Sequence, residues 1–277
     1  MSYQEGSGPR SRSPLHYVCG GMLALFVLMI LALIAADFIY LGQSAAGPKA
    51  LWDLLTQQQM FFALRMSLAT SLTTLILVLL TGVPIGYALS RYRFPLRAVC
   101  DMLVDVTLVL PPVVTGITLL AFFNFGFGQI IRAALERAEL STVSGVGIVM
   151  CQYLVAVPYC IRSAKAAFNG VDRNLEQVSR VMGCTEWQTF HRVSAPLALN
   201  GLIAGGVMAW ARALGVFAPI MVFVGTGPRV LTMPTTLWLE LSTGNIASAV
   251  AIAMVMLVLA GAALVLVHWL APEGNIV

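Results

Sequence analysis

The chain has 277 residues, of which 59% are hydrophobic and 10% are charged, and its mean hydropathy is +0.87. Because a soluble domain carries about 25% charged residues, this composition excludes a soluble protein and indicates an integral membrane protein. The net charge of +4 is modest and the basic residues are spread between apolar segments, so a nucleic-acid-binding surface is excluded.

The cysteines and histidines do not suggest a redox or metal site. The five cysteines lack a C-x-x-C motif and lie mostly in apolar segments: Cys19, Cys100, Cys151, Cys160 and Cys184. We interpret them as small buried residues without a disulfide framework. The three histidines lie far apart near predicted span ends, so we expect no metal site: His16, His191 and His268.

Two predicted spans open the chain. Residues 1–16 form a short polar tail, and the uncharged segment Val18–Ala36 is long enough to cross a bilayer, which needs about 20 residues. Because a signal peptide has an apolar region of only about 7–15 residues, a retained first span is favoured. The second span covers about Leu64–Leu89, and the arginine-rich stretch at 91–97 marks its cytosolic end.

The third predicted span, about Val99–Phe123, is interrupted by adjacent prolines at Pro111 and Pro112. Two prolines remove two backbone donors and must kink or break the helix. Thr115 and Gly116 follow the interruption, where carbonyl groups and a hydroxyl can face a cavity. Interrupted spans often line transport sites, so these residues are candidates for a passage wall. A kink that serves only packing is the alternative.

The next predicted elements are a surface helix and a fourth span. The charges at 129–141 are mixed, which indicates a short amphipathic helix on the outer surface. The fourth span covers about Val143–Cys160. Arg162 and Lys165 follow the span and lead into a polar loop.

The fifth predicted span, about Leu197–Val224, contains a run of glycines and one isolated charge. Gly201, Gly205 and Gly206 allow another helix to approach closely. Arg212 stands alone in an apolar run, and an intramembrane charge usually faces a cavity or a partner. A structural role, bonded to helix carbonyls, is the alternative for this arginine.

The chain ends with an outer loop and a sixth span. Residues 225–245 form the loop, which can partly re-enter the membrane, and the sixth span covers Ile246–Leu270. Residues 17–271 therefore form one membrane domain, and 272–277 a short tail. About twice as many of the 16 basic residues fall on the proposed cytosolic side as on the outer side, so we expect both termini in the cytosol.

The polar loop at 172–196, between the fourth and fifth spans, is predicted to fold as two short helices. Leu175, Val178 and Met182 recur at helical spacing and give the first helix an apolar edge. Gly183 ends this helix, since glycine tolerates the left-handed backbone conformation found at helix ends.

The second helix of the loop has its own start signal. Thr185 and Gln188 form a predicted capping box. Trp187, Phe190 and Val193 follow at spacing of three and share one side of the helix. A helical hairpin with exposed apolar side chains, held between two spans, is expected to dock onto another protein.

This loop resembles the EAA loop of binding-protein-dependent ABC transporter permeases. That motif reads E-A-A, three residues, Gly, nine residues, an aliphatic residue, one residue and Leu-Pro. Its glycine, aliphatic and proline positions are in register here: Gly183, Val193 and Pro196. Its E-A-A positions carry other residues, with a glutamate one place earlier: Gln177, Val178, Ser179 and Glu176. An ordinary amphipathic cytosolic loop is the alternative.

Two further stretches, 109–116 and 210–225, are similar to the molybdate, sulfate and tungstate branch of these permeases. The second stretch typically contains R-A-L-G-E-F-G-A, and five of its positions match in register here: Arg212, Ala213, Leu214, Gly215 and Phe217. Val216 replaces the glutamate, so this chain lacks a carboxylate that could pair with Arg212. The resemblance covers the chain from about residue 60 onward.

The resemblance implies an all-α type I importer permease with about six transmembrane helices and a cytoplasmic coupling helix between spans four and five. It implies docking of the loop onto a cytosolic ATPase by these residues: Glu176, Gln177, Val178, Ser179, Gly183, Trp187, Phe190, Val193 and Pro196. The candidate passage residues are Pro111, Pro112, Thr115, Gly116 and Arg212. The chain has no P-loop motif, so a partner ATPase dimer would bind ATP and Mg²⁺, and this chain would need no cofactor and perform no catalysis.

The implied assembly contains a second permease subunit, identical or paralogous, and an extracytoplasmic solute-binding protein, in a bacterial or archaeal cytoplasmic membrane. The first expected solute is molybdate, tungstate or sulfate. Alternatives are an importer permease for ferric iron, thiamine, phosphate, phosphonate or polyamine, or an ATP-independent secondary transporter. A membrane enzyme using Asp101 and Asp105 is a third alternative, but no other carboxylate or histidine stands nearby in the sequence.

Overall fold

The computed structural model describes residues 14–43, 57–138, 145–227 and 230–270, and every regular element in these ranges is a helix. The longer helices are α1 (Pro14–Gln43), α3 (Gln58–Arg91), α7 (Gly145–Asn169), α10 (Ala195–Leu214) and α13 (Ile246–Leu270). The shorter ones are α4 (Arg97–Val109), α5 (Pro112–Asn124), α6 (Phe127–Arg137), α8 (Arg173–Val181), α9 (Glu186–Thr189), the π-helix η1 (Phe190–Ser194), α11 (Ala218–Phe223) and α12 (Met233–Ser242).

The all-α membrane fold predicted from the sequence is confirmed for the described residues. Four helices there are long and apolar enough to cross a membrane, and a fifth span is added if α4 and α5 are counted together. The described apolar part of α13, Ile246–Ala262, is shorter than these. The helix bounds at Ile246 and Leu270 match the predicted sixth span.

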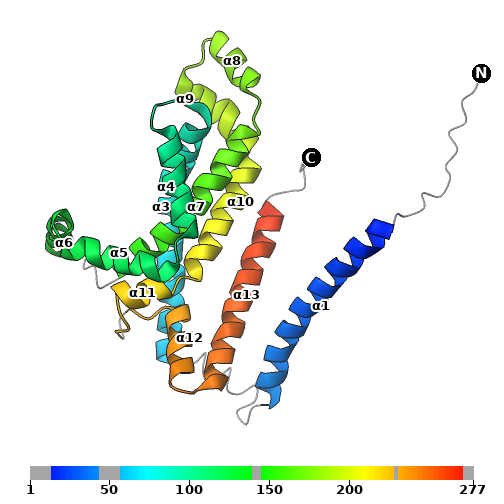
Figure 1. Ribbon diagram of the computed structural model, residues 1–277, viewed down its shortest axis with the longest axis vertical. Helices are drawn as coiled ribbons and strands as arrows, with labels where there is room; N and C mark the ends of the chain where they lie inside the picture. The colour runs from blue at the N-terminus through cyan, green and yellow to red at the C-terminus, as the bar shows by residue number, and fades with distance from the viewer. Residues whose placement is uncertain (1–13, 44–56, 139–144, 228–229, 271–277) are drawn as a thin grey trace, which may run out of the picture.

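The centre of the molecule is a bundle of α3, α7 and α10 (Figure 1). The glycines of α10 allow the close approach that the sequence predicts. A Cβ atom added at Gly205 would lie 2.5 Å from the Cβ of Ser163, and one at Gly201 would lie 2.5 Å from the Cβ of Ala167. Without side chains at these positions, the backbones of α7 and α10 come into direct contact.

A buried polar ladder fixes the register of α3 against α7. Gln152 of α7 is 1% exposed, and its amide accepts a hydrogen bond from Thr74 at 3.0 Å and donates to Thr70 at 3.3 Å. The indole N–H of Trp210 donates to Ser71 at 3.1 Å, which joins α10 to the same face. In a membrane, polar side chains need partners within the protein, so this ladder holds the bundle in one arrangement.

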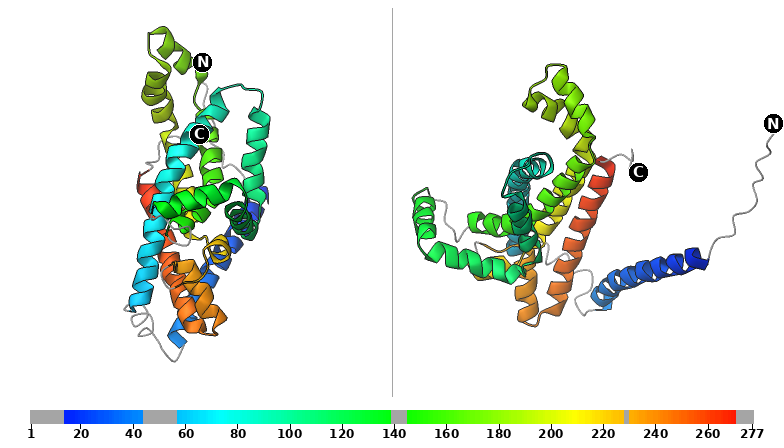
Figure 2. Two further views of the ribbon diagram at one scale, coloured as in Figure 1. Left: turned by 90° about the vertical axis from the view of Figure 1, so that its left-hand side faces the viewer. Right: turned by 45° about the horizontal axis from the view of Figure 1, so that its top comes forward.

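The adjacent prolines break the third predicted span completely. Pro112 begins α5, and the axes of α4 and α5 differ by 114°. In Figures 1 and 2, α5 extends sideways from the bundle and leads to α6. α6 covers most of the predicted surface helix at 129–141, of which residues 139–141 lie outside the described ranges.

The helix that contains the predicted fourth span does not end at Cys160, because α7 continues to Asn169. Arg162 and Lys165 therefore lie inside the helix. Two aspartates on α4 neutralise them: Lys165 lies 2.6 Å from Asp101, and Arg162 forms an ion pair with Asp105. These pairs join α4 to α7, and they make two basic residues compatible with a continuous helix.

The predicted end of the fifth span at Val224 was wrong. α10 ends at Leu214 and is capped by Gly215. The short helix α11 then begins beside Pro219, because proline fits the first turn of a helix and not its interior. The segment from Gly215 onward thus leaves the axis of α10 and packs on both α5 and α7.

The predicted outer loop at 225–245 contains α12, which begins with four buried residues at 233–236. A capping box between Thr232 and Thr235 starts this helix. The backbone N–H of Met233 donates to Ser67 of α3 at 2.7 Å, so α12 is bonded to the end of α3 farthest from α8 and α9 (Figure 1).

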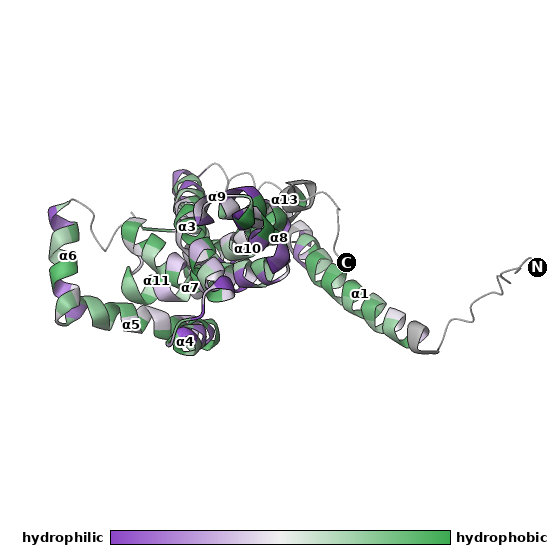
Figure 3. Ribbon diagram, turned by 90° about the horizontal axis from the view of Figure 1, so that it is seen from above, coloured by the Kyte–Doolittle hydropathy of each residue, from purple (hydrophilic) through white to green (hydrophobic). Residues whose placement is uncertain are grey.

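α1 stands apart from the bundle and contacts α13 (Figure 1). None of its apolar window is buried within the chain. Figure 3 shows mainly hydrophobic residues along α1 and α5, which both project from the centre, with α6 lying beyond α5. In a bilayer these surfaces lie against lipid or against another membrane helix.

Candidate functional site

The loop between α7 and α10 forms one end of the molecule (Figure 1). It folds as the predicted helical hairpin, with α8 followed by α9. The side chain of Asp172 caps α8 by accepting a hydrogen bond from the N–H of Asn174 at 2.9 Å. The cap fixes where the first helix of the loop begins.

Gly183 ends α8 as predicted, in a left-handed conformation with φ of +89°. Its N–H bonds to the carbonyl of Arg180 at 3.0 Å, and the N–H of Cys184 bonds to the carbonyl of Ser179 at 3.1 Å. An added Cβ at Gly183 would meet no atom within 4 Å, so the backbone angle alone requires glycine here.

The predicted capping box is present at the start of α9. The N–H of Gln188 donates to the hydroxyl of Thr185 at 3.3 Å, and the N–H of Thr185 donates to the amide oxygen of Gln188 at 2.9 Å. The helix then continues through η1 into α10, so that Glu186–Leu214 is one run of 29 residues. Pro196 lies inside this run, one π-turn after α9, and does not separate the loop from the span.

The outward face of the loop is apolar. Trp187 is 70% exposed and stacks on Phe190 with ring centroids 5.9 Å apart. Val181 is 88% exposed and Val178 is also exposed. Exposed apolar side chains gathered at one end of a protein mark a surface for another protein. Of the other predicted loop residues, Gln177 and Pro196 are exposed and Val193 is half-buried.

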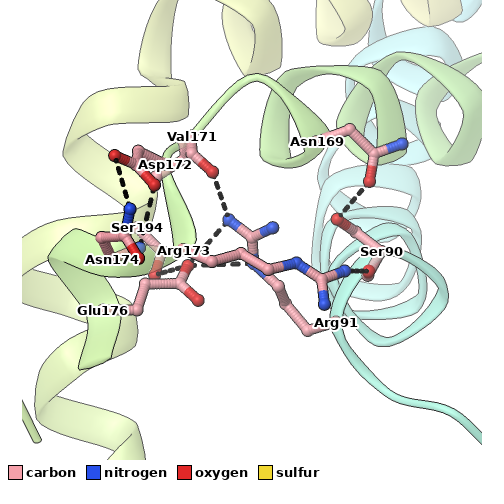
Figure 4. Close-up of polar contacts among 9 residues, drawn as sticks. All are labelled: Ser90, Arg91, Asn169, Val171, Asp172, Arg173, Asn174, Glu176 and Ser194. Carbon is pink, nitrogen blue, oxygen red and sulfur yellow. Dashed lines mark hydrogen bonds and ion pairs between the residues drawn. The ribbon is translucent and has the colours of Figure 1, made fainter.

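Glu176 faces inward and is bound to the end of α3 (Figure 4). Its Oε1 accepts hydrogen bonds from Nε of Arg91 at 3.0 Å and from the hydroxyl of Ser194 at 2.6 Å, and it lies 2.9 Å from Nη2 of Arg91. The side chains of Arg91 and Glu176 are only 7% and 8% exposed. Nη2 of Arg91 also donates to the carbonyl of Val171 at 3.0 Å.

Sequence reasoning assigned Arg91 only to the basic stretch that marks the cytosolic side. The one sequence feature that points to its pairing is its place in the last turn of an apolar helix, where a long side chain can reach a neighbouring loop. Ser179, a predicted docking residue, is likewise buried, and its hydroxyl lies 3.2 Å from that of Thr189.

A second set of bonds holds the last turn of α3. Nη2 of Arg173 donates to the carbonyl of Ser90 at 3.0 Å, and the hydroxyl of Ser90 donates to Asn169 at 2.7 Å (Figure 4). The end of α7 and the start of α8 are therefore both hydrogen-bonded to Ser90 in the last turn of α3.

Aromatic rings fill the space beneath the loop. The ring of Tyr87 lies 5.0 Å from that of Phe168 and 4.8 Å from that of Phe190. A groove of about 440 Å³ opens beside them and is lined in part by Tyr92 and Trp187. Burial raises the pKa of Tyr92 above its usual range, and the Glu186 carboxylate raises it further, so the phenol stays protonated and donates to Glu186.

The candidate passage residues fall into two places. Thr115 and Gly116 are buried, and an added Cβ at Gly116 would lie 2.8 Å from Cα of Pro219. This contact shows that Gly116 packs α5 against α11. The prediction that this segment lines a passage stays a prediction.

Arg212 lies in the last turn of α10 and is exposed. Its guanidinium lies 5.7 Å from the ring centroid of Tyr159 on α7. Within the described ranges, no carboxylate lies within 4.0 Å of it. Among the residues that the structure describes, the charge therefore has an aromatic face as its partner.

Comparison with known proteins places this geometry in a family. The profile described as "binding-protein-dependent transport system inner membrane component" matches residues 82–273. A probable molybdenum ABC transporter permease protein of Haloferax volcanii is 35% identical over 89% of this chain and 88% of its own length. The molybdate/tungstate transport system permease protein WtpB of Thermococcus kodakarensis is 31% identical over 91% of this chain and 95% of its own length.

A solved structure shares the fold. The crystal structure of a bacterial ABC transporter involved in the import of the acidic polysaccharide alginate has a chain that superposes with a TM-score of 0.71, at 16% identity, over 92% of both chains. The permease fold inferred from the loop motif is thus confirmed by profile, relatives and structure. The chain belongs to the family of binding-protein-dependent transport system inner membrane components.

Proposed function

We propose that this chain is the membrane permease of an ABC importer for a tetrahedral oxyanion, with molybdate or tungstate as the first candidates. The observation that carries this proposal is the similarity over most of the chain to permeases named for molybdenum, molybdate and tungstate. A second permease subunit, identical or paralogous, completes the passage. An extracytoplasmic binding protein delivers the anion, and a cytosolic ATPase dimer binds ATP and Mg²⁺.

The exposed face of the loop supports docking onto the ATPase. Trp187 and Val178 present apolar surface at the end of the molecule, while Gly183 and the Thr185 capping box fix the backbone that carries them. Such a surface is costly in water and is stabilised by burial against a partner. The docked ATPase moves the loop when it closes around ATP.

The loop is joined to two spans by the chain itself, because it follows α7 directly and continues without a break into α10. Its displacement therefore tilts both helices and exposes the passage to the opposite face. The assembly switches between two states, and ATP and the loaded binding protein each act by preferring one of them.

Arg212 supports an anionic solute. An exposed cation without a carboxylate partner on the described chain is expensive in a membrane unless it faces water, an anion or a partner subunit. Two copies across a passage would attract a divalent oxyanion.

Reconstitution tests the solute. The permease, its ATPase and its binding protein are placed in proteoliposomes, and ATP-dependent uptake of molybdate, tungstate and sulfate is compared with that of phosphate, phosphonate, ferric iron, thiamine and polyamine. We expect uptake and stimulated ATP hydrolysis with molybdate and tungstate. Uptake of a different solute would overturn the oxyanion assignment, and uptake without ATPase or ATP would overturn the importer assignment.

Substitution of Trp187 by Asp tests the docking surface. A charge at the centre of an apolar contact should weaken ATPase association by about 30-fold or more, as loss of a hot-spot residue does at about 2 kcal/mol. Co-purification and binding titration measure it. Leu241→Asp is the control, because Leu241 is also an exposed apolar residue but lies on α12 at the opposite end. Equal ATPase binding by the Trp187 variant and the wild type would contradict the docking role.

A further inference from the structure

The carboxylate of Glu176 is turned away from the docking face and buried against α3. One of its oxygens joins three elements, because it accepts from Arg91 of α3 and from Ser194 of η1 while itself belonging to α8. A buried ion pair contributes little net stability, since desolvation offsets the attraction, so its value lies in holding one geometry.

We propose that Arg91, Glu176 and Ser194, here called the clamp, make the end of α3 move as one body with the loop. α3 is then a third helix driven by the ATPase, beside α7 and α10. The proposal rests on the proposed function, since it assigns a route for the motion that the docked ATPase generates.

α3 is not continuous with the loop along the chain, because α4, α5, α6 and α7 lie between α3 and α8. Arg91 and Glu176 are 85 residues apart in the sequence. Only noncovalent contacts can therefore carry motion between them. Ring contacts such as the edge-on pair of Tyr87 and Phe190 resist compression, but they separate readily when pulled. Charged hydrogen bonds resist both pushing and pulling, and they are shorter and stronger than neutral ones.

Further hydrogen bonds fix the clamp to both α3 and the loop, and we call this contact between the end of α3 and the loop the joint. Arg91 also binds the carbonyl of Val171, and Arg173 binds the carbonyl of Ser90, so the last turn of α3 is bonded to the chain before and within α8. Ser194 is the last residue of the π-helix, and the wider π-turn determines the direction in which its side chain leaves the backbone. π-turns are often found at functional positions.

α3 can carry the motion to the far end of the molecule. Ser67, near the other end of α3, accepts a hydrogen bond from the N–H of Met233 at the start of α12. The clamp and this bond are therefore at opposite ends of a single helix. Through α3, a displaced loop changes the position of α12, on the face where a binding protein would dock.

Spin labels test whether the joint is rigid. Arg93→Cys and Asn174→Cys place labels on exposed positions beyond α3 and on α8, in a background whose native cysteines are replaced and which retains transport. Pulsed electron resonance measures the distance between them in the full complex without nucleotide and with ATP and vanadate. We expect the same distance in both states. A distance that changes between the two states in the unsubstituted clamp would overturn the proposal.

Substitutions then test whether the joint matters for coupling. Arg91→Met and Glu176→Gln are made singly and together, with Arg132→Met and Glu136→Gln as the matched control, because that exposed ion pair lies within α6. Typical coupling free energies correspond to about 5–150-fold, so we expect the ratio of solute-stimulated to basal ATP hydrolysis to fall about ten-fold in the clamp variants. The label distance in the double variant should also become state-dependent.

The outcomes separate the two proposals. A wild-type complex that neither binds an ATPase nor responds to solute would sink the proposed function. If the wild-type complex is coupled but the clamp variants keep both the ratio of solute-stimulated to basal ATP hydrolysis and the fixed label distance, only the clamp proposal is overturned. If Arg91→Met does not assemble, the wild-type distance measurement still decides, and Arg91→Lys provides the variant that keeps the charge.

Discussion

Gly183 shows how a single residue shapes the loop. Its positive φ places the carbonyls at the end of α8 within reach of the N–H groups that follow, and a Cβ added there would meet no atom within 4 Å. A residue with a Cβ pays about 1–2 kcal/mol in the left-handed conformation. The effect of substitution is thus a pure backbone effect, separable from packing.

We predict that Gly183→Ala loosens the loop. A cost of about 1–2 kcal/mol changes the local opening equilibrium about 5–30-fold, so the amides around 179–184 should exchange with deuterium faster by that factor. Gly183→Asn should have a smaller effect, because asparagine tolerates this conformation. Gly21→Ala on α1 is the control, since Gly21 also has open space around its Cβ position. Unchanged exchange in Gly183→Ala would refute the prediction.

We predict that Arg212→Met raises the oxyanion concentration needed for half-maximal uptake about ten-fold, the equivalent of 1.4 kcal/mol. Arg212→Lys should retain part of the affinity because it keeps the charge. Arg65→Met is a close control: its guanidinium lies 5.8 Å from the ring of Phe61, much as Arg212 lies beside Tyr159, but at the far end of α3. Equal effects of both substitutions would argue against a specific role of Arg212.

Local features of the loop could be predicted from the sequence, but long-range partners could not. Gly183 and the Thr185 capping box depend on residues a few positions apart, so the motif alone identifies them. The motif alignment put the acidic position at Gln177, whereas the carboxylate one place earlier turns inward. Adjacent helical residues point about 100° apart, and the partner that decides the direction, Arg91, is distant in sequence.

At the scale of elements, α4 is held by charge more than by apolar burial. None of its residues is buried, and Asp101 and Asp105 join it to α7. Because the chain breaks at Pro111 and Pro112, the axis of α4 does not follow the axis of α5. α4 is therefore attached to α7 chiefly by these ion pairs.

We predict that Lys165→Met destabilises the protein by about 1–2 kcal/mol, less than a fully buried pair because the site is partly exposed. Adding Asp101→Asn should recover part of the loss, since it removes the unpaired charge. Thermal unfolding in detergent measures both. Glu136→Gln, which breaks an exposed pair within α6, is the control and should shift Tm little. Greater destabilisation by the control than by Lys165→Met would contradict the role of this pair.

The two predicted spans whose ends differ from the observed helix ends, the fourth and the fifth, differ because their tertiary partners cannot be read from the local sequence. The predicted fourth span ends at Cys160 because two basic residues, Arg162 and Lys165, follow it in the sequence. The helix continues past them because aspartates of α4 neutralise their charges, which the local sequence does not reveal. The fifth span was extended past Leu214 because the sequence stays apolar, although Gly215 and Pro219 break the helix. Composition predicts where a segment can be buried, while tertiary partners decide where a helix ends.

At the scale of the whole molecule, the loop and α12 occupy opposite ends of the bundle (Figure 1). The sequence predicted this division from its basic residues and apolar segments, and it predicted the helical membrane class correctly. It did not predict that α5 leaves the bundle, because a proline pair specifies an interruption but not the angle between the two halves.

We predict that the two ends react from opposite sides of the membrane. In a functional background without native cysteines, Asn174→Cys should react with an impermeant maleimide only after cells are permeabilised, whereas Ser242→Cys should react in intact cells. Inverted vesicles should give the reverse order. Both positions are exposed, so access to the reagent is set by the bilayer. Labelling of Asn174→Cys in intact cells would show that the orientation is inverted.

The unbroken helix from Glu186 to Leu214 fixes both the distance between the loop and the membrane span and the rotation of the loop about the helix axis. Its 29 residues form a rod of roughly 43 Å, and each residue advances the azimuth by about 100°. Inserting one residue after Pro196 would therefore rotate the Trp187 face about a quarter turn away from Arg212, while inserting seven would lengthen the rod and nearly restore the phase. The spacing between these two residues is thus a constraint on insertions and deletions that neither residue reveals by itself.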